Sequence, residues 1–369
     1  MKILMLVNWK VERCSQPPDD RQPPDYVAEG KPYWFYRYFQ TPVQVDVLDV
    51  SSFPALERLE KEKLRFYVLQ ALRAIPKMNR YDLVVSHGMQ SGVVVSLFRR
   101  FFPGQPRHIV FDIGSFNSAA ESGGALKLMQ FASHSLDGLI YHTGTQKDYY
   151  REFFPWLLPK SRFIGFGTDS AFFAAKEKPS EEESSGGYIL CVGYHKRDWD
   201  TLIRAYALLA EGWENGRLFP ALKLVGKPDY RLPESFSIPE WASLEKMPYI
   251  PVRQLMNQIA GALFCVLPLE AFNYSFGQMT LLQQMAMEKA VITARVPSML
   301  DYVEDGKDGL FYEPGNAKDL CDKMHTLLQD PILCEKIGRQ AAVSVKTLHN
   351  EKEMARKVEA FYKEVLEGK

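Results

Sequence analysis

The chain has 369 residues, of which 46% are apolar and 24% charged, so length and composition predict two globular domains, each with a buried core. Basic and acidic residues balance at 45 each, which argues against a nucleic-acid-binding protein, for which a basic excess is typical. The five cysteines are widely spaced and form no C-x-x-C pair. We therefore expect reduced thiols rather than disulfides or a zinc site.

The amino-terminal stretch KILMLV is a short apolar run without a small-residue cleavage site, so it is typical of a strand rather than a signal peptide. No stretch approaches the roughly 20 apolar residues that span a bilayer, and we expect a cytoplasmic protein. The aromatic and basic stretches KPYWFYRYFQ and LFRRFF leave two interpretations open. They either form amphipathic packing helices or contact the inner face of a membrane peripherally, where a lipid-linked acceptor would lie.

Short apolar runs alternate with helix-length segments along the whole chain. The expected strands are, in order, KILMLV, VQVDVLDV, YDLVVSH, RHIVFDIG, LDGLIYHT, RFIGFG, YILCVG, ALKLVG, ALFCVLP, AVITA and GLFY. Helix-length segments between them include residues 201–211, 253–261 and 317–328. Because the runs are continuously apolar, they indicate parallel strands covered on both faces by helices. The pattern predicts an α/β fold of the doubly wound type.

Two segments interrupt this alternation. Residues 13–31 follow the first strand and are rich in Pro and Asp; no G-x-G-x-x-G follows that strand, which disfavours a nicotinamide or flavin site. A loop of this length is either functional or disordered. Residues 175–187, AKEKPSEEESSGG, are charged and predict a linker between domains at 1–174 and 188–349. Ligands are then expected in a cleft between these domains, at the carboxyl ends of the strands.

The segment NYSFGQMTLLQQMAMEKAVI predicts a helix that begins after Gly277. A glycine there lets a ligand approach the backbone, and the free N–H groups of the first turn attract anions. Gln278 and Thr280 add side-chain donors, and Gln283 lies about 9 Å further along, roughly the separation between a diphosphate and its sugar. The helix would then hold a nucleotide diphosphate. The alternative is a capped core helix with Gln283 and Gln284 in solvent.

Several motifs occur in a fixed order: YILCVGYHKRDWDTLIRAYALLA, then FG, QMAMEKAVI and DYVEDGKDGLFYEPGNAKDL. Together they resemble the signature of retaining glycosyltransferases of the GT-B fold, family 4 type (glycosyl transferases group 1). LIYHTGTQKDYYREFF and RFIGFGTDSAFF resemble the family's first-domain motifs, so the resemblance spans residues 81–328. It implies two Rossmann-like, doubly wound parallel-sheet domains facing a central cleft, the first binding the acceptor and the second the donor. It also implies that a C-terminal helix at about 350–369 packs back on the first domain.

In this family an arginine and a lysine after the first strand of the second domain neutralise the donor's diphosphate. Here Arg197 stands at the lysine position, and Lys196 or His195 stands close to the arginine position. The resemblance assigns catalytic roles to Arg197 and Lys196, and also to Asp112 and His87. It further implies donor contacts at Gly193, Asn273, Ser275, Gly277, Gln278, Thr280 and Gln283.

The sequence departs from the family pattern at several positions. Gln283 replaces the second glutamate of an E-x7-E pair, and residues 273–275 offer no carboxylate for the first. Asp112 stands where many members have a histidine, whereas His87 matches a position that is often histidine, although a lone histidine is usually structural. A glutamine still donates to and accepts from ribose hydroxyls, so donor binding is expected to survive.

The implied reaction moves a hexose, with retention, from a nucleotide-diphosphate sugar to a hydroxyl of a glycan, lipid-linked or small-molecule acceptor. A donor phosphate oxygen takes the acceptor proton. No D-x-D motif sits in a suitable loop, so we expect side-chain cations in place of a metal, and no cofactor. Two alternatives remain, because fold does not fix reaction. One is a nucleotide-sugar-binding module that lost turnover; the other is an epimerase or phosphorylase on the same fold.

Overall fold

The structure is a computed structural model that describes residues 1–51, 54–60, 66–114, 121–174, 187–193, 196–213, 218–231, 237–271 and 275–368. The chain folds into two compact units. The N-terminal unit comprises Met1–Gly165, Asn273–Phe276 and Lys352–Lys369, and the C-terminal unit comprises Phe166–Phe272 and Gly277–Glu351. Apart from Gly187, the predicted linker at 175–187 lies outside the described residues.

The N-terminal unit is built on a six-stranded parallel sheet with the strand order β4-β1-β5-β6-β7-β8. Its strands are β1 (Lys2–Leu6), β4 (Gln44–Leu48), β5 (Leu83–His87), β6 (Arg107–Asp112), β7 (Gly138–Tyr141) and β8 (Ser161–Phe163). Every residue of β5 and β7 is buried, as continuous apolar runs require. The predicted doubly wound α/β fold is confirmed for this unit.

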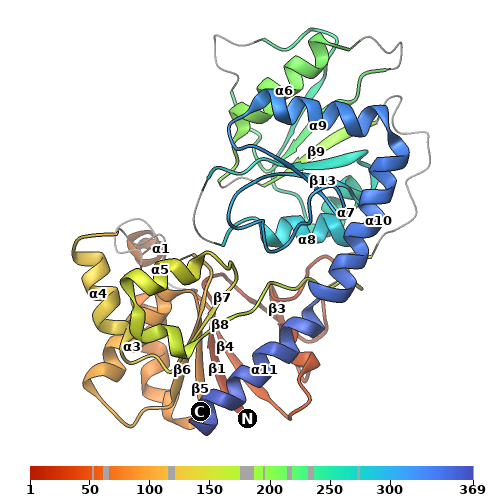
Figure 1. Ribbon diagram of the computed structural model, residues 1–369. Helices are drawn as coiled ribbons and strands as arrows, with labels where there is room; N and C mark the ends of the chain where they lie inside the picture. The colour runs from red at the N-terminus through yellow and green to blue at the C-terminus, as the bar shows by residue number, and fades with distance from the viewer. Residues whose placement is uncertain are drawn as a thin grey trace. The chain divides into compact units, whose positions relative to one another are not determined.

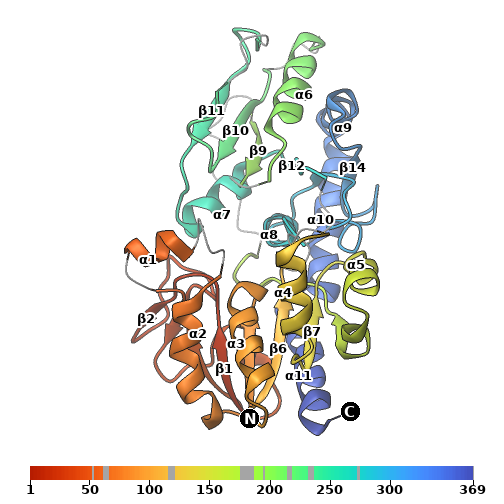
Figure 2. The same ribbon diagram turned by 90° about the vertical axis from the view of Figure 1, so that its left-hand side faces the viewer.

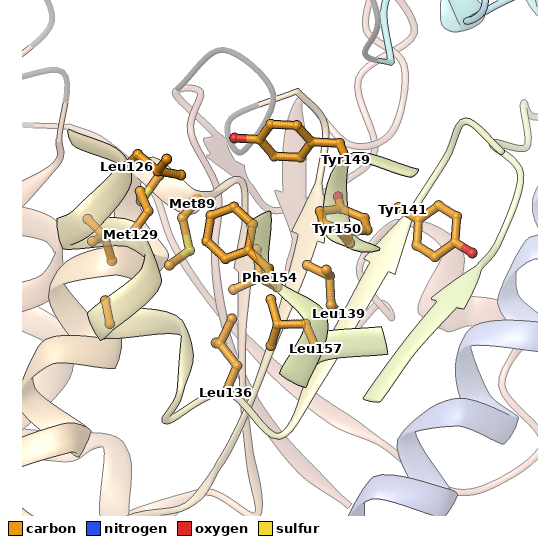
Figure 3. Packing of buried hydrophobic residues seen from close by; sticks show 13 residues of the cluster. Met89, Leu126, Met129, Leu136, Leu139, Tyr141, Tyr149, Tyr150, Phe154 and Leu157 are labelled. Carbon is orange, nitrogen blue, oxygen red and sulfur yellow. The ribbon is translucent and has the colours of Figure 1, made fainter. Parts of the chain in front are cut away.

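Helices cover both faces of this sheet (Figures 1 and 2). One face carries α2 (Val68–Ala74), α3 (Met89–Phe101), α4 (Gly124–Ser133) and α5 (Gln146–Phe153), and the opposite face carries α11 (Glu351–Glu367). Shorter helices are α1 (Pro54–Arg58), η1 (Trp34–Tyr38), η3 (Ile75–Arg80) and η4 (Pro155–Lys160). Figure 3 shows the apolar core under α4 and α5, where Leu126 and Met129 approach Met89, and Phe154 and Leu157 lie beside them.

The C-terminal helix α11 belongs to the N-terminal unit. Its apolar side is buried, as the spacing of Met354, Val358, Phe361 and Val365 predicts. Polar contacts add to this packing, because the Glu359 carboxylate accepts hydrogen bonds from the backbone N–H groups of residues 40 and 41 at 2.8 and 2.9 Å. Apolar packing and the hydrogen bonds of Glu359 therefore both hold α11 on this unit.

The early segment 13–31 is ordered. β2 (Glu12–Cys14) pairs in parallel with β3 (Tyr26–Ala28), a small sheet that the sequence pattern does not predict. The aromatic stretch that follows forms η1, in which Trp34, Phe35 and Tyr36 are buried. Internal packing is therefore the correct interpretation of KPYWFYRYFQ. The five cysteines are free thiols, as expected.

The C-terminal unit contains a second six-stranded parallel sheet, with the order β11-β10-β9-β12-β13-β14. Its strands are β9 (Tyr188–Val192), β10 (Ala221–Val225), β11 (Leu244–Met247), β12 (Phe264–Leu267), β13 (Val291–Ala294) and β14 (Leu310–Tyr312). In Figure 1, α6 (Trp199–Glu211) and α9 (Ala317–Gln329) cover one face, and α7 (Val252–Gly261), α8 (Gln278–Ala286) and α10 (Pro331–Leu348) cover the other.

Three of these helices begin where a side chain caps the first turn. The side chains of Asp198, Asn316 and Asp330 accept hydrogen bonds from the backbone N–H groups three residues later, at the starts of α6, α9 and α10. The helices expected at 201–211, 253–261 and 317–328 correspond to α6, α7 and α9. Helix α10 was not predicted.

The strand orders give each sheet one point where the chain reverses its direction of winding. This switch point lies between β1 and β5 in the N-terminal unit, and between β9 and β12 in the C-terminal unit. Adjacent connections leave the sheet on opposite faces there, so a crevice opens at the carboxyl ends of the two strands. Each switch point is therefore a candidate ligand site.

Candidate functional site

Arg197 lies at the switch point of the C-terminal unit. It follows β9 and forms an antiparallel bridge with Leu269, which follows β12. The side chain is only 6% exposed. Its Nε donates to the Val192 carbonyl at 3.0 Å, and its Nη2 donates to the Thr280 hydroxyl at 3.4 Å. The guanidinium thus links the carboxyl end of β9 to the first turn of α8, and the structure brings together the predicted residues Arg197 and Thr280.

Gly193 is required for this placement of Arg197. Its φ is +123°, and a β-carbon there would lie 2.4 Å from the Arg197 Nη2. Any side chain at position 193 would therefore displace the guanidinium. Lys196, the second predicted cation, is exposed and has a left-handed backbone with φ of 57°. His195, the alternative to Lys196, lies outside the described residues.

The start of α8 is fixed by Gly277, which caps the helix in the left-handed conformation with φ of 88°. A β-carbon there would lie 3.1 Å from the Leu269 side chain. The backbone conformation and the packing against Leu269 thus favour glycine here, whether or not a ligand approaches this position. The first-turn N–H groups of α8 have no partner within the helix, which makes this end suited to an anion.

The glutamines of α8 are buried, so the alternative interpretation, a core helix with Gln283 and Gln284 in solvent, is wrong in its placement of these side chains. Gln278 donates from Nε2 to the Ser298 carbonyl at 3.1 Å. Gln284 is fully buried, and neither atom of its side-chain amide has a hydrogen-bond partner among the residues that the structure describes. Ser275, just before the helix, is also buried, and its hydroxyl has no partner in the part of the chain that the structure describes; Asn273 lies outside that part.

The switch point of the N-terminal unit holds a different set of side chains. His87 ends β5, and its ring lies 4.7 Å from Trp9, 5.6 Å from Trp34 and 5.7 Å from Phe111, measured between ring centroids. Among the described residues, neither ring nitrogen has a hydrogen-bond partner, and burial lowers the pKa of His87 to about 3. The imidazole is therefore neutral. Sequence reasoning missed Trp9 and Trp34; the signal for Trp9 was its place in the loop that follows the first strand, three residues after Leu6.

Asp112 ends β6 and is fully buried in the same unit. Its carboxylate accepts hydrogen bonds from the Gly114 N–H at 3.0 Å, from Gln146 Nε2 at 3.1 Å and from the Tyr150 hydroxyl. Burial, and then the nearby Asp112 charge, raise the pKa of Tyr150, so the phenol stays protonated and donates. The carboxylate is thus engaged by neighbouring groups of its own unit.

Among the described residues, no group of three or more His, Cys, Asp or Glu side chains is arranged to hold a metal ion. Within the same residues, no helix is both long and apolar enough to cross a bilayer.

Comparison with known families identifies the C-terminal unit. Residues 186–330 match the family model of glycosyl transferases group 1. The C-terminal unit is a group 1 glycosyl transferase domain. No curated protein sequence matches the chain.

Solved structures extend the similarity to the whole chain. Sucrose-phosphate synthase from Thermosynechococcus elongatus is similar over all of both chains, with a TM-score of 0.69 and 16% identity. Anabaena HepE in complex with UDP and glucose has a TM-score of 0.67 and 15% identity, covering 98% of this chain and 99% of HepE. A glycosyltransferase from Rickettsia africae has a TM-score of 0.65 and 16% identity over 89% and 91% of the chains. The group 1 glycosyl transferase domain therefore forms part of a GT-B fold, as predicted.

Proposed function

We propose that the protein is a retaining glycosyltransferase of the hexosyltransferase type, which moves a sugar from a nucleotide-diphosphate sugar to a hydroxyl acceptor. The observation that carries this proposal is the buried Arg197 guanidinium at the switch point, beside the first turn of α8. A departing nucleoside diphosphate gains negative charge. A fixed cation and a helix N-terminus in a desolvated place stabilise that charge more strongly than water-exposed groups do.

The electrostatics of Arg197 favour an anionic ligand. Burial lowers the pKa of the guanidinium, because the charged form loses hydration. A phosphate beside it would compensate for that loss. The Val192 carbonyl and the Thr280 hydroxyl hold the guanidinium in place without a ligand, so little reorganisation is needed on binding. Lys196 supplies a second, exposed cation in the same turn.

The proposed transfer needs no protein nucleophile, because the acceptor oxygen bonds directly to the sugar. The bond between the sugar C1 and the diphosphate oxygen breaks, and its electron pair passes to the phosphate. The acceptor oxygen bonds to C1 on the same face, and its proton moves to that phosphate oxygen. Arg197, Lys196 and the α8 N–H groups balance the phosphate charge, so the step uses no metal and no cofactor. His87 would contact the acceptor or the donor sugar, and Asp112 would position the chain around Gly114.

The first donors to test are UDP sugars. Anabaena HepE is described in complexes with UDP and with UDP-glucose, and the Staphylococcus aureus TarM mutant in a complex with UDP. Because this chain shares their fold, we propose a UDP sugar as donor, and a glycan, lipid-linked or small-molecule alcohol as acceptor.

The test is the release of UDP by the full chain, with and without acceptor alcohols, in excess chelator. We expect turnover to persist in chelator and Arg197→Ala to lower it by about 10²-fold or more. Arg204→Ala, an exposed arginine on α6, is the matched control and should be silent. Unchanged turnover in folded Arg197→Ala would refute the role of this residue. An absolute need for magnesium or manganese would refute the metal-free step.

A second candidate function is a nucleotide-sugar-binding module without turnover. It is favoured by Asp112, which is fully engaged by three donors of its own unit. This candidate predicts calorimetric binding of a UDP sugar with no UDP released for any acceptor tested. Release of UDP that depends on an acceptor excludes it.

A further inference from the structure

A hollow of about 560 Å³ lies at the amino edge of the N-terminal unit's sheet. It is bounded by the end of α3, the turn at residues 103–106 and the start of β6. Three arginines line it: Arg99, Arg100 and Arg107. None of these residues belongs to the proposed transferase site.

The charges in this hollow leave a positive excess. The Asp137 carboxylate pairs with both Arg99, at 2.6 Å, and Arg107, at 2.9 Å, so one carboxylate serves two arginines. Asp82, also in the lining, accepts a hydrogen bond from the backbone N–H of Lys2 at 2.7 Å. The Arg99 side chain is only 10% exposed, and its Nε has no hydrogen-bond partner within the described ranges of the chain. A buried, unpaired guanidinium N–H at the wall of a hollow is a donor suited to an anionic oxygen.

Large aromatic side chains stand exposed beside the hollow. Phe101 is 67% exposed, Phe102 55% and Phe131 42%. Phe131 of α4 lies 5.9 Å from Phe101 between ring centroids, and the Arg100 guanidinium carbon lies 5.4 Å from the Phe131 ring centroid. The rings and the cation therefore form one continuous surface across the ends of two helices.

The side of α4 that carries Phe131 does not pack into the core. Figure 3 shows Leu126 and Met129 pointing from α4 into the core towards Met89. Lys127 and Phe131, on the other side of the helix, are exposed. We call the resulting patch the α3–α4 surface; it comprises Arg100, Phe101, Phe102, Arg107, Lys127 and Phe131.

We propose that the α3–α4 surface docks the protein onto an anionic lipid membrane. Exposed phenylalanines enter the boundary between headgroups and acyl chains, while arginine and lysine contact the lipid phosphates. A second copy of the chain fits less well. A symmetric dimer would bring two copies of this positively charged surface together, and like charges repel.

Docking in this way would leave the carboxyl edge of the same sheet uncovered. The hollow lies at the amino ends of β5 and β6, whereas His87 and Asp112 end those strands. The docking proposal is therefore independent of the proposed reaction, and either can fail alone.

The test is co-sedimentation of the full chain with vesicles of mixed phosphatidylglycerol and phosphatidylcholine, against phosphatidylcholine alone. We expect binding to the mixed vesicles only, weakened by added salt. Phe101→Ser and Arg100→Glu should each lower the partition coefficient about tenfold. Matched controls are Ile332→Ser, which removes an apolar side chain that is 80% exposed, and Arg204→Glu, and both should bind like the parent.

Three results would overturn the proposal. The first is a parent protein that does not sediment with mixed vesicles. The second is Phe101→Ser and Arg100→Glu variants that bind as the parent does. The third is a dimer in solution that both variants dissociate, because the surface would then be an interface between copies. Turnover with a soluble acceptor should be unchanged in both variants, which separates this test from that of the reaction.

Discussion

The two switch points have the same architecture but differ in charge. In the C-terminal unit a buried cation, Arg197, lies between a glycine and a helix N-terminus. In the N-terminal unit a neutral imidazole, His87, lies among Trp9, Trp34 and Phe111. A parallel sheet supplies the crevice in both, and the residues that follow the strands decide its chemistry. On the proposed function, the first site suits a diphosphate, and the second suits an uncharged hydroxyl-bearing group.

The largest expected effect follows from displacing the cation. A β-carbon in Gly193→Ala would meet the Arg197 guanidinium at 2.4 Å and force it aside. We expect turnover of a UDP sugar to fall by about 10²-fold, the cost of misplacing a charge-stabilising group by roughly 1 Å.

Gly306→Ala is the matched control for that variant. Gly306 also has a positive φ, of 76°, but a β-carbon there would meet nothing within 4 Å. Both variants carry backbone strain, whereas only Gly193→Ala moves the guanidinium. Equal turnover in the two variants would show that the position of Arg197 is irrelevant to the reaction.

The neutral switch point predicts a stability that depends on pH. Burial lowers the pKa of His87 to about 3 and that of His142 to about 4, below the ordinary value of 6.5. The unfolded chain therefore binds more protons below pH 6.5, so stability is full above that pH and is lost as the pH falls towards 4 and then 3. We expect a loss of about 1.4 kcal/mol per pH unit for each of these histidines.

Hydrogen exchange at pH 7 and pH 4, corrected for intrinsic exchange rates, would locate this loss. Peptides of the N-terminal unit should lose more protection than peptides of the C-terminal unit. His87→Phe should reduce the difference, because the ring makes no hydrogen bond with the described residues and phenylalanine does not titrate. Equal losses in the two units would contradict the electrostatic contrast.

The adjacent glutamines of α8 predict effects of different kinds. Gln283→Ala should weaken UDP binding by about 1–3 kcal/mol, through lost hydrogen bonds to the nucleotide. Gln284→Leu should leave binding unchanged and raise the free energy of unfolding by about 1 kcal/mol, because it removes a buried amide that has no hydrogen-bond partner among the described residues. Calorimetry and denaturant titration of both variants measure the two effects. If Gln284→Leu lost UDP binding and Gln283→Ala did not, Gln284 rather than Gln283 would be the residue that contacts the nucleotide.

The sequence predicts the framework well, because continuous apolar runs and capped helices are local signals. Of the twelve strands in the two sheets, the sequence does not predict β11 (Leu244–Met247). This strand is half exposed and carries no apolar run. The β2–β3 pair was missed for a related reason: each strand has only three residues, too few to show a periodic pattern in the sequence. Helix α10 follows α9 without an intervening strand, so strand–helix alternation gave no sign of it.

The candidate sites were only partly predictable. Arg197 and Thr280 could be named from motifs, but they are 83 positions apart in the sequence, and their contact depends on the fold between them. The approach of Trp9 to His87 depends on strand order in the same way. Gly277 was expected to serve a ligand; its φ of 88° and its closeness to Leu269 mean that Gly277→Val would also destabilise the fold. Nothing in the sequence indicates that Gln284, like the adjacent Gln283, is buried.

The central claim is that Arg197 binds the charged part of the donor, and calorimetric titration with UDP and with uridine tests it most directly. Removing the cation should affect only the ligand that carries phosphates. We predict that Arg197→Ala weakens UDP binding at least tenfold, leaves uridine binding as in the parent, and that Arg204→Ala changes neither. Equal affinity for UDP in the parent and in folded Arg197→Ala, or an equal loss for UDP and uridine, would contradict the account.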